Sequence, residues 1–206
     1  NDVLSFKTEF GRVSNLILRQ AGGGKYYAVD ISQGRLELED CDITSQSNVC
    51  VVIQDKADPH LRRNRILNGK VGIFIHTNGK GTLEDNEISG STYSGVQITK
   101  GSEPILRRNR IYKGKGAGIA VVNKGKGTLE DNDIYANATY GVAVKEGGSP
   151  TLLRNRITQN VWYGIYICDK GSGVFTDNDL RNNNRGAWDI DDSSKDNVTR
   201  SGNIEE

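Results

Sequence analysis

The sequence predicts an all-β protein, a parallel β-solenoid of about eight coils of 22 or 23 residues each, in a single domain over residues 1–206. Three observations predict it. Pairs of apolar residues recur at this spacing, a column of asparagines recurs in step with them, and the segments between them have the glycine-rich composition of turns. No segment between the columns shows the i, i+3, i+4, i+7 spacing of an amphipathic helix, so each coil is expected to consist of short strands.

Each coil contains a short strand whose apolar side chains point inward. Apolar residues stand two positions apart in every period, and the second of each pair forms the column Ile31, Ile53, Ile75, Ile98, Val121, Val144, Ile167 and Ile190. Residues two apart on a strand lie on the same face. Three positions before each member of the column stands a small residue, Ala, Cys or Gly. We therefore expect this face to contribute to a common core in every coil.

A second column marks a bend in each coil. It consists of Ile43, Ile66, Ile88, Ile111, Ile134, Ile157 and Leu180. Two positions before its members stand Cys41 and then Asn64, Asn86, Asn109, Asn132, Asn155 and Asn178. We expect these amides to bond to the asparagines of the neighbouring coils and to the turn backbone, because an unpaired buried amide costs about 1–3 kcal/mol. Asparagine also tolerates the left-handed conformation that a sharp bend requires, so we expect it to adopt that conformation here.

The residues that flank the asparagines change sign from coil to coil. The chain reads LRRNRI at 61–66 and 106–111, but LEDNEI at 83–88 and LEDNDI at 129–134. If successive coils stack in register about 4.8 Å apart, each arginine lies between carboxylates of the two neighbouring coils. Arg108, for example, is expected near both Asp85 and Asp131. Such pairs contribute roughly 0.2–1 kcal/mol each, and a slip by one coil would bring like charges together.

Leucine-rich repeats are the rival interpretation of the fold, because they share this period range and an asparagine in the repeat. They usually carry a longer leucine-rich consensus and a helix or extended segment on the convex side. Both ends of the chain depart from the repeat. We expect residues 1–24 to form a partial N-terminal coil and residues 191–206 a partial C-terminal coil, with no capping helix. The absence of strong caps indicates a fragment of a longer protein, or ends covered by end-to-end or face association.

Composition excludes several classes of function. The chain has 27 Lys and Arg against 26 Asp and Glu, so no basic excess points to nucleic acid. No apolar run approaches the roughly 18 residues of a membrane helix, and no signal peptide is visible at the N-terminus. The cysteines Cys41, Cys50 and Cys168 match no zinc spacing. Their odd number indicates reduced, buried thiols and favours an intracellular location, although the sequence leaves the compartment open.

The repeat resembles a known family. Segments such as EPILRRNRI and GKGTLEDN, each followed by a G-I-x-V or G-V-x-V strand, resemble the right-handed parallel β-helix repeats of the pectin-lyase-like superfamily. They are most similar to the group found in F-box proteins with β-helix repeats and in bacterial relatives. The resemblance covers residues 34–190 and implies three short parallel sheets and a right-handed path, which is also the general preference of parallel crossovers. The superfamily includes polysaccharide lyases, hydrolases, epimerases, carbohydrate-binding segments and protein-interaction platforms, so it leaves function open.

One outward face is the candidate binding surface, since enzymes of the superfamily that the repeat resembles often bind substrate along an outward sheet face. Between the inward pairs stand Asp30, Val52, Phe74, Gln97, Ala120, Ala143, Tyr166 and Asp189, and the middle of this face carries few charges. Aromatic residues gather in the C-terminal half, where Tyr140 and Tyr163 share a column and are expected to stack. The candidate binding residues are Phe74, Tyr140, Trp162, Tyr163 and Tyr166. The alternatives are that the apolar residues are simply strand formers and that the aromatic rings pack turns.

Candidate catalytic residues are few. Asp189 and Asp191 stand two apart beside Asp192 in WDIDD, so they could act on a sugar or bind Ca²⁺. The alternative is a solvated, charged end coil. The hydrolase motifs of the superfamily, an Asn-Thr-Asp followed by Asp-Asp and Gly-His-Gly, are absent. His76 points outward alone and is expected to be idle or satisfied, and the lysines of the turns are expected to keep the protein soluble.

The sequence therefore predicts a non-catalytic binding or scaffold module that recognises a protein or carbohydrate partner on the outward face. It predicts no cofactor apart from a possible Ca²⁺ ion, no nucleic-acid partner and no membrane. Two alternatives stay open. The first is a lyase or glycoside hydrolase that acts on an acidic polysaccharide with Asp189, Asp191 and Asp192, and the second is a structural spacer.

Overall fold

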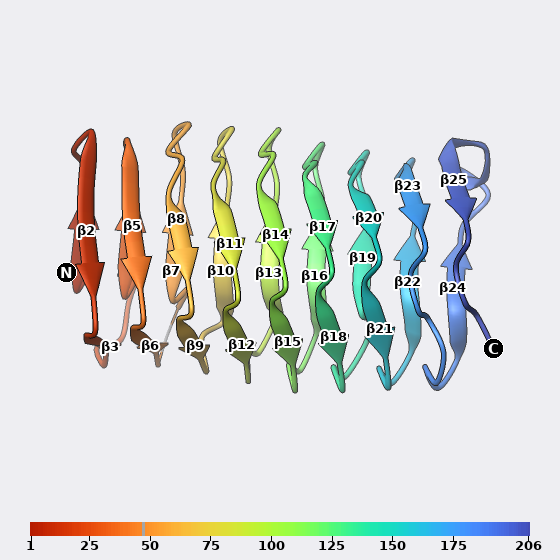
Figure 1. Cartoon of the computed structure of the whole chain (residues 1–206), viewed down its shortest axis with the longest axis horizontal. Coiled ribbons are helices and arrows are strands. Elements are labelled where there is room, and N and C mark those ends of the chain that lie inside the picture. Colours follow the sequence, from red (N-terminus) through yellow and green to blue (C-terminus); the bar gives the residue numbers. More distant parts are fainter. Residues whose placement is uncertain (47) are drawn as a thin grey trace.

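The structure is a computed structural model that describes residues 1–46 and 48–206. The chain winds into a solenoid whose coils lie side by side along one axis, with the two termini at opposite ends (Figure 1). Three parallel sheets run along this axis. The only helix among the described residues is the three-residue 3₁₀ turn η1 (Lys195–Asn197). The predicted all-β parallel solenoid with three sheets is confirmed.

Every coil contributes strands in the same order. Sheet A contains β1 (Leu4–Phe6), β4 (Val29–Ile31), β7 (Val51–Ile53), β10 (Val71–Ile75), β13 (Ser94–Ile98), β16 (Ala117–Val121), β19 (Val142–Val144), β22 (Tyr163–Ile167) and β24 (Gly186–Ile190). Sheet B contains β2 (Phe10–Ser14), β5 (Arg35–Glu39), β8 (His60–Arg62), β11 (Thr82–Glu84), β14 (Ile105–Arg107), β17 (Thr128–Glu130), β20 (Thr151–Leu153), β23 (Gly173–Thr176) and β25 (Val198–Ser201). Sheet C contains β3 (Ile17–Gln20), β6 (Asp42–Ser45), β9 (Arg65–Leu67), β12 (Glu87–Ser89), β15 (Arg110–Tyr112), β18 (Asp133–Tyr135) and β21 (Arg156–Thr158).

Two of the sheets have nine strands in the described residues, one more than the eight coils that the repeat predicts. The additional coil is the first, in which β1, β2 and β3 place one strand in each sheet. Leu4 lies beside Val29 and Phe6 beside Ile31, a step of 25 residues instead of 22 or 23. This longer step explains why the repeat pattern does not mark the first coil. At the other end, residues 191–206 add β25 to sheet B.

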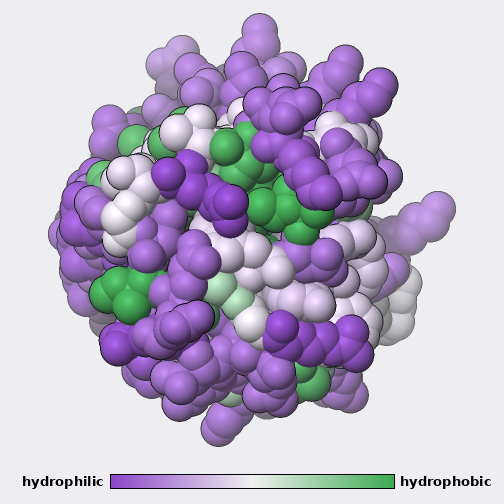
Figure 2. Space-filling model, turned by 90° about the vertical axis from the view of Figure 1, so that its right-hand side faces the viewer, coloured by the Kyte–Doolittle hydropathy of each residue, from purple (hydrophilic) through white to green (hydrophobic). Residues whose placement is uncertain are grey.

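The core lies inside the coils and is built from the predicted columns. Ile73, Val96 and Ile119 lie directly beside one another on successive strands of sheet A, and all three are fully buried. Where the small residue of this column is glycine, side chains packed against it leave no room for a Cβ atom. A Cβ atom on Gly118 would lie 2.5 Å from Cγ2 of Ile134, closer than two carbon atoms can approach. Viewed onto the C-terminal end, the surface is mostly hydrophilic, and hydrophobic side chains show in small separate groups between the hydrophilic ones (Figure 2).

The asparagine column forms the predicted ladder. Oδ1 of Asn109 accepts hydrogen bonds from the backbone N–H (3.1 Å) and Nδ2 (3.0 Å) of Asn86. Nδ2 of Asn109 in turn donates to Oδ1 of Asn132 and to the carbonyl of Leu83. One part of the prediction is wrong, because the left-handed residue is the charged residue before each asparagine. Those residues are Asp40, Arg63, Asp85, Arg108, Asp131, Arg154 and Asp177, with φ between 52° and 55°.

The charged flanks pair across coils as predicted in sign, but Arg108 pairs on one side only. Arg108 donates from Nε to Oδ1 of Asp85 in the preceding coil at 2.9 Å and also pairs with Glu84. The expected contact of Arg108 with Asp131 is not made, because Arg154 of the coil after Asp131 occupies that carboxylate. Arg107 faces the other way and pairs with Glu130 at 3.1 Å. Arg107 and Arg108 therefore divide the two directions between them, whereas Arg65 pairs with Asp42 on one side and Glu87 on the other.

A second ladder, which the sequence analysis did not identify, closes the bend before sheet A in the last coils. Oδ1 of Asn137 accepts from the backbone N–H of Gly114, and Nδ2 of Asn137 donates to Oδ1 of Asn160. Asn160 continues the ladder to Asn183. Asn137 also begins the sequence Asn-Ala-Thr, but its side chain is only 1 % exposed. The amide is therefore structural.

The predicted buried cysteines are confirmed. Cys41, Cys50 and Cys168 are all buried and unpaired. Burial raises the pKa of the Cys50 thiol to about 12. Within residues 1–46 and 48–206, no helix has the length and apolar character needed to span a membrane.

Candidate functional site

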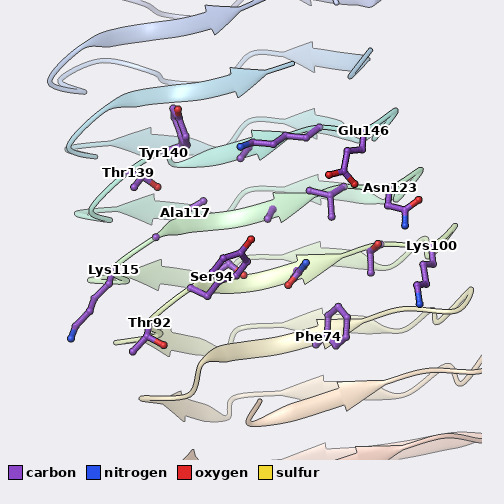
Figure 3. A pocket seen from close by; sticks show the side chains of 18 residues that line it. Phe74, Thr92, Ser94, Lys100, Lys115, Ala117, Asn123, Thr139, Tyr140 and Glu146 are labelled. Atoms are coloured by element: carbon purple, nitrogen blue, oxygen red, sulfur yellow. The ribbon is translucent and has the colours of Figure 1, made fainter. Parts of the chain in front are cut away.

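The outer face of sheet A contains a groove, which we call the sheet A groove. Its floor consists of small or short polar side chains of β13, β16 and β19, among them Ser94, Gln97, Ala117, Ala120 and Ala143. Larger side chains stand at both ends, so the face is hollowed into a volume of about 630 Å³ that extends from Phe74 to Tyr140 (Figure 3). This is the face that the sequence predicted to carry few charges.

Three rings gather at the C-terminal end of the groove. Tyr140 stacks on Tyr166 with a centroid distance of 4.4 Å and an interplanar angle of 12°. Trp162 meets Tyr140 edge-on at 5.1 Å. The expected stack of Tyr140 on Tyr163 is wrong, because the ring of Tyr140 lies against Tyr166 in the next column. Ala143 occupies that column in the coil of Tyr140, and its small side chain leaves room for this diagonal contact. The structure thus brings three of the predicted binding residues together.

The two stacked tyrosines stay protonated, and the ammonium group of Lys145 lies near their rings. Burial raises the pKa of Tyr140. A hydrogen bond with the Cys168 thiol, together with burial, raises the pKa of Tyr166. Both rings are therefore neutral at physiological pH. Nζ of Lys145 lies 4.8 Å from the Tyr166 centroid and 5.9 Å from that of Tyr140, within the range of cation–π attraction.

The N-terminal end of the groove is formed by Phe74 and Tyr93. Phe74 contacts the ring of His76 with centroids 4.7 Å apart. Tyr93 is 59 % exposed. Burial and the neighbouring charge of Lys100 lower the pKa of His76, so the imidazole is neutral at pH 7. Its Nδ1 lies 2.7 Å from Oγ1 of Thr77, which agrees with the prediction of a satisfied histidine.

The charges around the groove are mostly positive. Lys100, Lys115 and Lys145 line it, against the single acidic residue Glu146. Lys115 and Lys100 stand on opposite sides of the floor, and Glu146 lies on the side of Lys100 (Figure 3). The sequence analysis assigned Lys100 and Lys145 to solubility, whereas the structure places both at the rim of a groove. The arrangement favours an elongated, negatively charged ligand.

The three candidate catalytic carboxylates do not line this groove, and their surroundings differ. Asp189 is on β24, in register with Tyr166. Oδ2 of Asp191 accepts a hydrogen bond from the backbone N–H of Asp169 at 3.0 Å, and this bond lowers the pKa of Asp191. Asp192 pairs with Lys195, and its side chain is 96 % exposed. Asp191 thus holds a turn, and Asp192 points into solvent.

The residues nearest to a metal-binding arrangement are Cys168, Asp169 and Asp191, which offer ligand atoms within 4.8 Å of one another. Ca²⁺ takes six to eight oxygen ligands. The group supplies two carboxylates and a thiol whose pKa is raised by burial. Of the two residues that the sequence linked to Ca²⁺, Asp191 belongs to this group and Asp189 does not.

Several groove residues were missed by sequence reasoning, although the repeat contains a signal for them. Tyr93 and Lys115 stand in turns just before β13 and β16, at the edge of the outward columns. Tyr93 and Trp162 occupy the same position of the repeat, three periods of 23 residues apart. Continuing the columns into the turns would therefore have identified Tyr93. The hollow itself depends on the sizes of neighbouring side chains in three columns. These side chains become neighbours only when the coils stack in register.

Comparison with solved structures finds the same fold in other proteins. The periplasmic alginate epimerase AlgG aligns with a TM-score of 0.63 and 20 % identity, over 88 % of this chain and 51 % of that one. The A-module of the mannuronan C-5 epimerase AlgE4 from Azotobacter vinelandii aligns with a TM-score of 0.56 and 13 % identity, over 94 % of this chain and 68 % of that one. At these identities the likeness concerns the fold. The chain spans about half the length of the AlgG structure.

The sequence comparisons define the family. No curated protein matches the chain at a significant level. The family model described as the right handed beta helix region matches residues 49–204, most of the sequence. This match confirms the right-handed path, and the chain therefore belongs to the right-handed β-helix family.

Proposed function

We propose that the protein is a non-catalytic binding module that holds an acidic polysaccharide in the sheet A groove. The observation that carries this proposal is the combination of aromatic rings at both ends of the groove with three lysines and one acid around it. Phe74 and Tyr140 are separated by three coil steps, about 14 Å at the usual strand spacing. The groove is therefore long enough for a short stretch of a linear sugar chain.

The side chains of the groove match the groups of a sugar acid. Apolar ring faces of tyrosines pack against the C–H faces of sugars. Lysines attract carboxylates. The floor supplies the hydrogen-bonding amide of Gln97.

The structural neighbours support a carbohydrate ligand, because both are named as epimerases of alginate or mannuronan. Their activity is a property of those proteins. A second candidate for this chain is an enzyme acting on acidic polysaccharide with Asp189, Asp191 and Asp192, with or without Ca²⁺. The binding module is favoured because Asp191 already accepts a backbone hydrogen bond and Asp192 pairs with Lys195.

A protein partner on the same face is the other candidate. It is favoured by the resemblance of the repeat to the β-helix repeats of F-box proteins. Exposed aromatic residues such as Tyr93 also serve as anchors at protein interfaces. The lysines of the groove favour an acidic polysaccharide over a protein partner, because the cores of protein interfaces are depleted in lysine.

The test is calorimetric titration with oligomers of mannuronate and galacturonate, with a neutral gluco-oligosaccharide as the charge control. Tyr140→Ala should weaken binding about tenfold through loss of a stacked ring. The matched control is Tyr112→Ala. It also removes a stacked tyrosine, whose ring centroid lies 5.0 Å from that of Tyr135, but this pair belongs to sheet C and not to the sheet A groove. Equal binding of neutral and acidic oligomers, or equal loss in both variants, would contradict the proposal.

The same oligomers test the enzyme alternative. They are incubated with the protein, with and without Ca²⁺, and analysed for unsaturated, shortened or epimerised products. Turnover that disappears in Asp191→Asn would overturn the non-catalytic assignment and support the carboxylate site.

A further inference from the structure

A second hollow lies on the outer face of sheet A, on the N-terminal side of Phe74. We call it the apolar pocket. It has a volume of about 430 Å³ and is lined chiefly by Tyr27, Val49, Lys70, Val71, Phe74 and Tyr93. A volume of this size is typical of small-ligand sites. It shares Phe74 and Tyr93 with the sheet A groove, so the two sites are continuous.

The walls of the apolar pocket are held in place by a small hydrophobic cluster outside the solenoid. Val49, Val52 and Val71 are 6 %, 0 % and 5 % exposed although they belong to the outer side of sheet A, and they form a cluster separate from the main core. Tyr27 and Phe74 pack against it. Side chains on an outer sheet face are ordinarily solvated. Here packing fixes the walls, so the pocket is formed before any ligand binds.

The polar groups of the apolar pocket select the charge of its ligand. Among the described residues, Lys70 is the only charged one that lines it, and the amides of Asn48 and Gln97 are also part of the lining. A cationic ligand would find a like charge and no carboxylate. Three rings, those of Tyr27, Phe74 and Tyr93, surround two valines. Rings of this kind bind a flat π-system through stacked and edge-on contacts.

We propose that the apolar pocket binds a planar aromatic carboxylate of one or two rings. The ring lies between the three aromatic side chains and over the valines. Its carboxylate faces Lys70 and the two amides. This site differs from the proposed polysaccharide site in Tyr27, Val49, Lys70 and Val71, which do not line the sheet A groove, whereas Phe74, Tyr93 and Gln97 line both.

The test is titration with 2-naphthoate, followed by saturation-transfer NMR and calorimetry. Acetate supplies the charge without the ring, and 2-naphthylmethanol supplies the ring without the charge. We expect saturable binding of naphthoate, at least threefold weaker binding of the alcohol and none of acetate. Tyr27→Ala should weaken naphthoate binding about three- to tenfold through loss of one ring contact. Lys70→Gln should weaken binding of naphthoate but not of the alcohol.

Matched controls are available next to both residues. Tyr26→Ala removes a 46 % exposed ring beside Tyr27 that does not line the apolar pocket. Lys115→Gln removes a lysine that lines only the sheet A groove. Both should leave naphthoate binding unchanged. If Tyr27→Ala reduces thermal stability, Tyr93→Ala repeats the test, because the ring of Tyr93 is 59 % exposed.

Three results would overturn the proposal: no saturable binding of naphthoate, equal affinity for the acid and the alcohol, or an unchanged affinity in Tyr27→Ala. Failure of this site and failure of the polysaccharide site are distinguishable. Tyr140→Ala should weaken oligouronate binding and leave naphthoate binding intact, and Tyr27→Ala should weaken naphthoate binding and leave oligouronate binding intact.

Discussion

Arg108 reaches back to Asp85 of the preceding coil, from Nε to Oδ1 at 2.9 Å, and makes no ion pair with Asp131 of the following one. The coil of Arg108 is therefore bound to its two neighbours by different arginines, Arg107 toward one side and Arg108 toward the other. The alternation of sign along the chain makes both contacts attractive. Both side chains of the Arg108–Asp85 pair remain more than a third exposed, so screening by solvent keeps the contribution of a single pair small.

Reversing one charge of this array should have a larger effect than removing it. Arg108→Glu places a third carboxylate beside Glu84 and Asp85, and we expect the free energy of unfolding to fall by about 1 kcal/mol. Arg108→Gln should lower it by no more than about 0.5 kcal/mol. Urea unfolding at low and high salt measures both. The difference between the variants should shrink in high salt, and a difference that salt leaves unchanged would show that charge is not its cause.

Removing one rung of the asparagine ladder should destabilise the protein strongly. Asn109→Ala leaves the backbone N–H of Asn86 and the carbonyl of Leu83 without the buried amide that bonds them. Because each unsatisfied buried group costs about 1–3 kcal/mol, we expect the two together to lower the free energy of unfolding by at least about 2 kcal/mol in urea or thermal unfolding. Asn184→Ala is the control, since Asn184 is exposed and its side chain takes no part in the ladder. A loss below about 1 kcal/mol for Asn109→Ala would contradict the prediction.

Acid should weaken the fold. A hydrogen bond from Arg62 lowers the pKa of Glu39, and one from Arg63 lowers that of Asp40. A carboxylate whose pKa is lowered on folding stabilises the folded state. Its contribution is complete above the unfolded pKa of about 4 and is lost as the pH falls through the folded pKa. Burial raises the pKa of Asp30, which acts in the opposite direction, but the lowered carboxyls outnumber it. The urea midpoint should therefore be flat from about pH 6 to 8 and fall below about pH 4.

The control for acid destabilisation is Arg62→Gln, which removes the main cause of the lowered Glu39 pKa. Its midpoint should fall less than that of the wild type between pH 7 and pH 3. A wild-type midpoint that stays the same across this interval would refute the assignment.

Oligouronate binding should depend on salt. The lysines of the sheet A groove, such as Lys100 and Lys115, attract the ligand through solvent, and the Debye length falls from about 30 Å at 0.01 M to about 3 Å at 1 M. We expect affinity to fall with added NaCl, and to fall less steeply in Lys115→Gln. A salt-independent affinity would indicate that the aromatic rings alone bind the ligand.

The thiols should be protected by the fold. Burial raises the pKa of Cys50 to about 12, and it also raises that of Cys41 and Cys168, so very little of the reactive thiolate form exists at pH 7. We expect a thiol-specific chromogenic reagent to modify all three slowly in the native protein and rapidly in urea. Fast modification of one cysteine without unfolding would reveal a local opening of its coil.

The sequence by itself determined the solenoid, because each column of the repeat records one position of the coil. Isoleucines two apart define the inward face, and the ladder asparagines define a bend at which an amide can satisfy its neighbours only if coils stack in register. The same logic predicted attraction between Arg108 and Asp85. It could not assign the left-handed conformation to the residue before each asparagine, because a repeating Asp or Arg at that place reads equally well as a surface charge.

Tertiary structure decided the sites. The ring of Tyr140 stacks on Tyr166 and not on Tyr163, because the small side chain of Ala143 leaves space between the columns. This contact depends on side-chain volumes in adjacent coils. Tyr27 and Val71 likewise enclose a pocket only because 44 residues of chain return them to the same face of sheet A. A repeat fixes where the backbone goes, since its hydrogen bonds and core contacts recur identically in each coil. Hollows arise where side chains stop repeating, and their shapes become defined only once those coils are packed together.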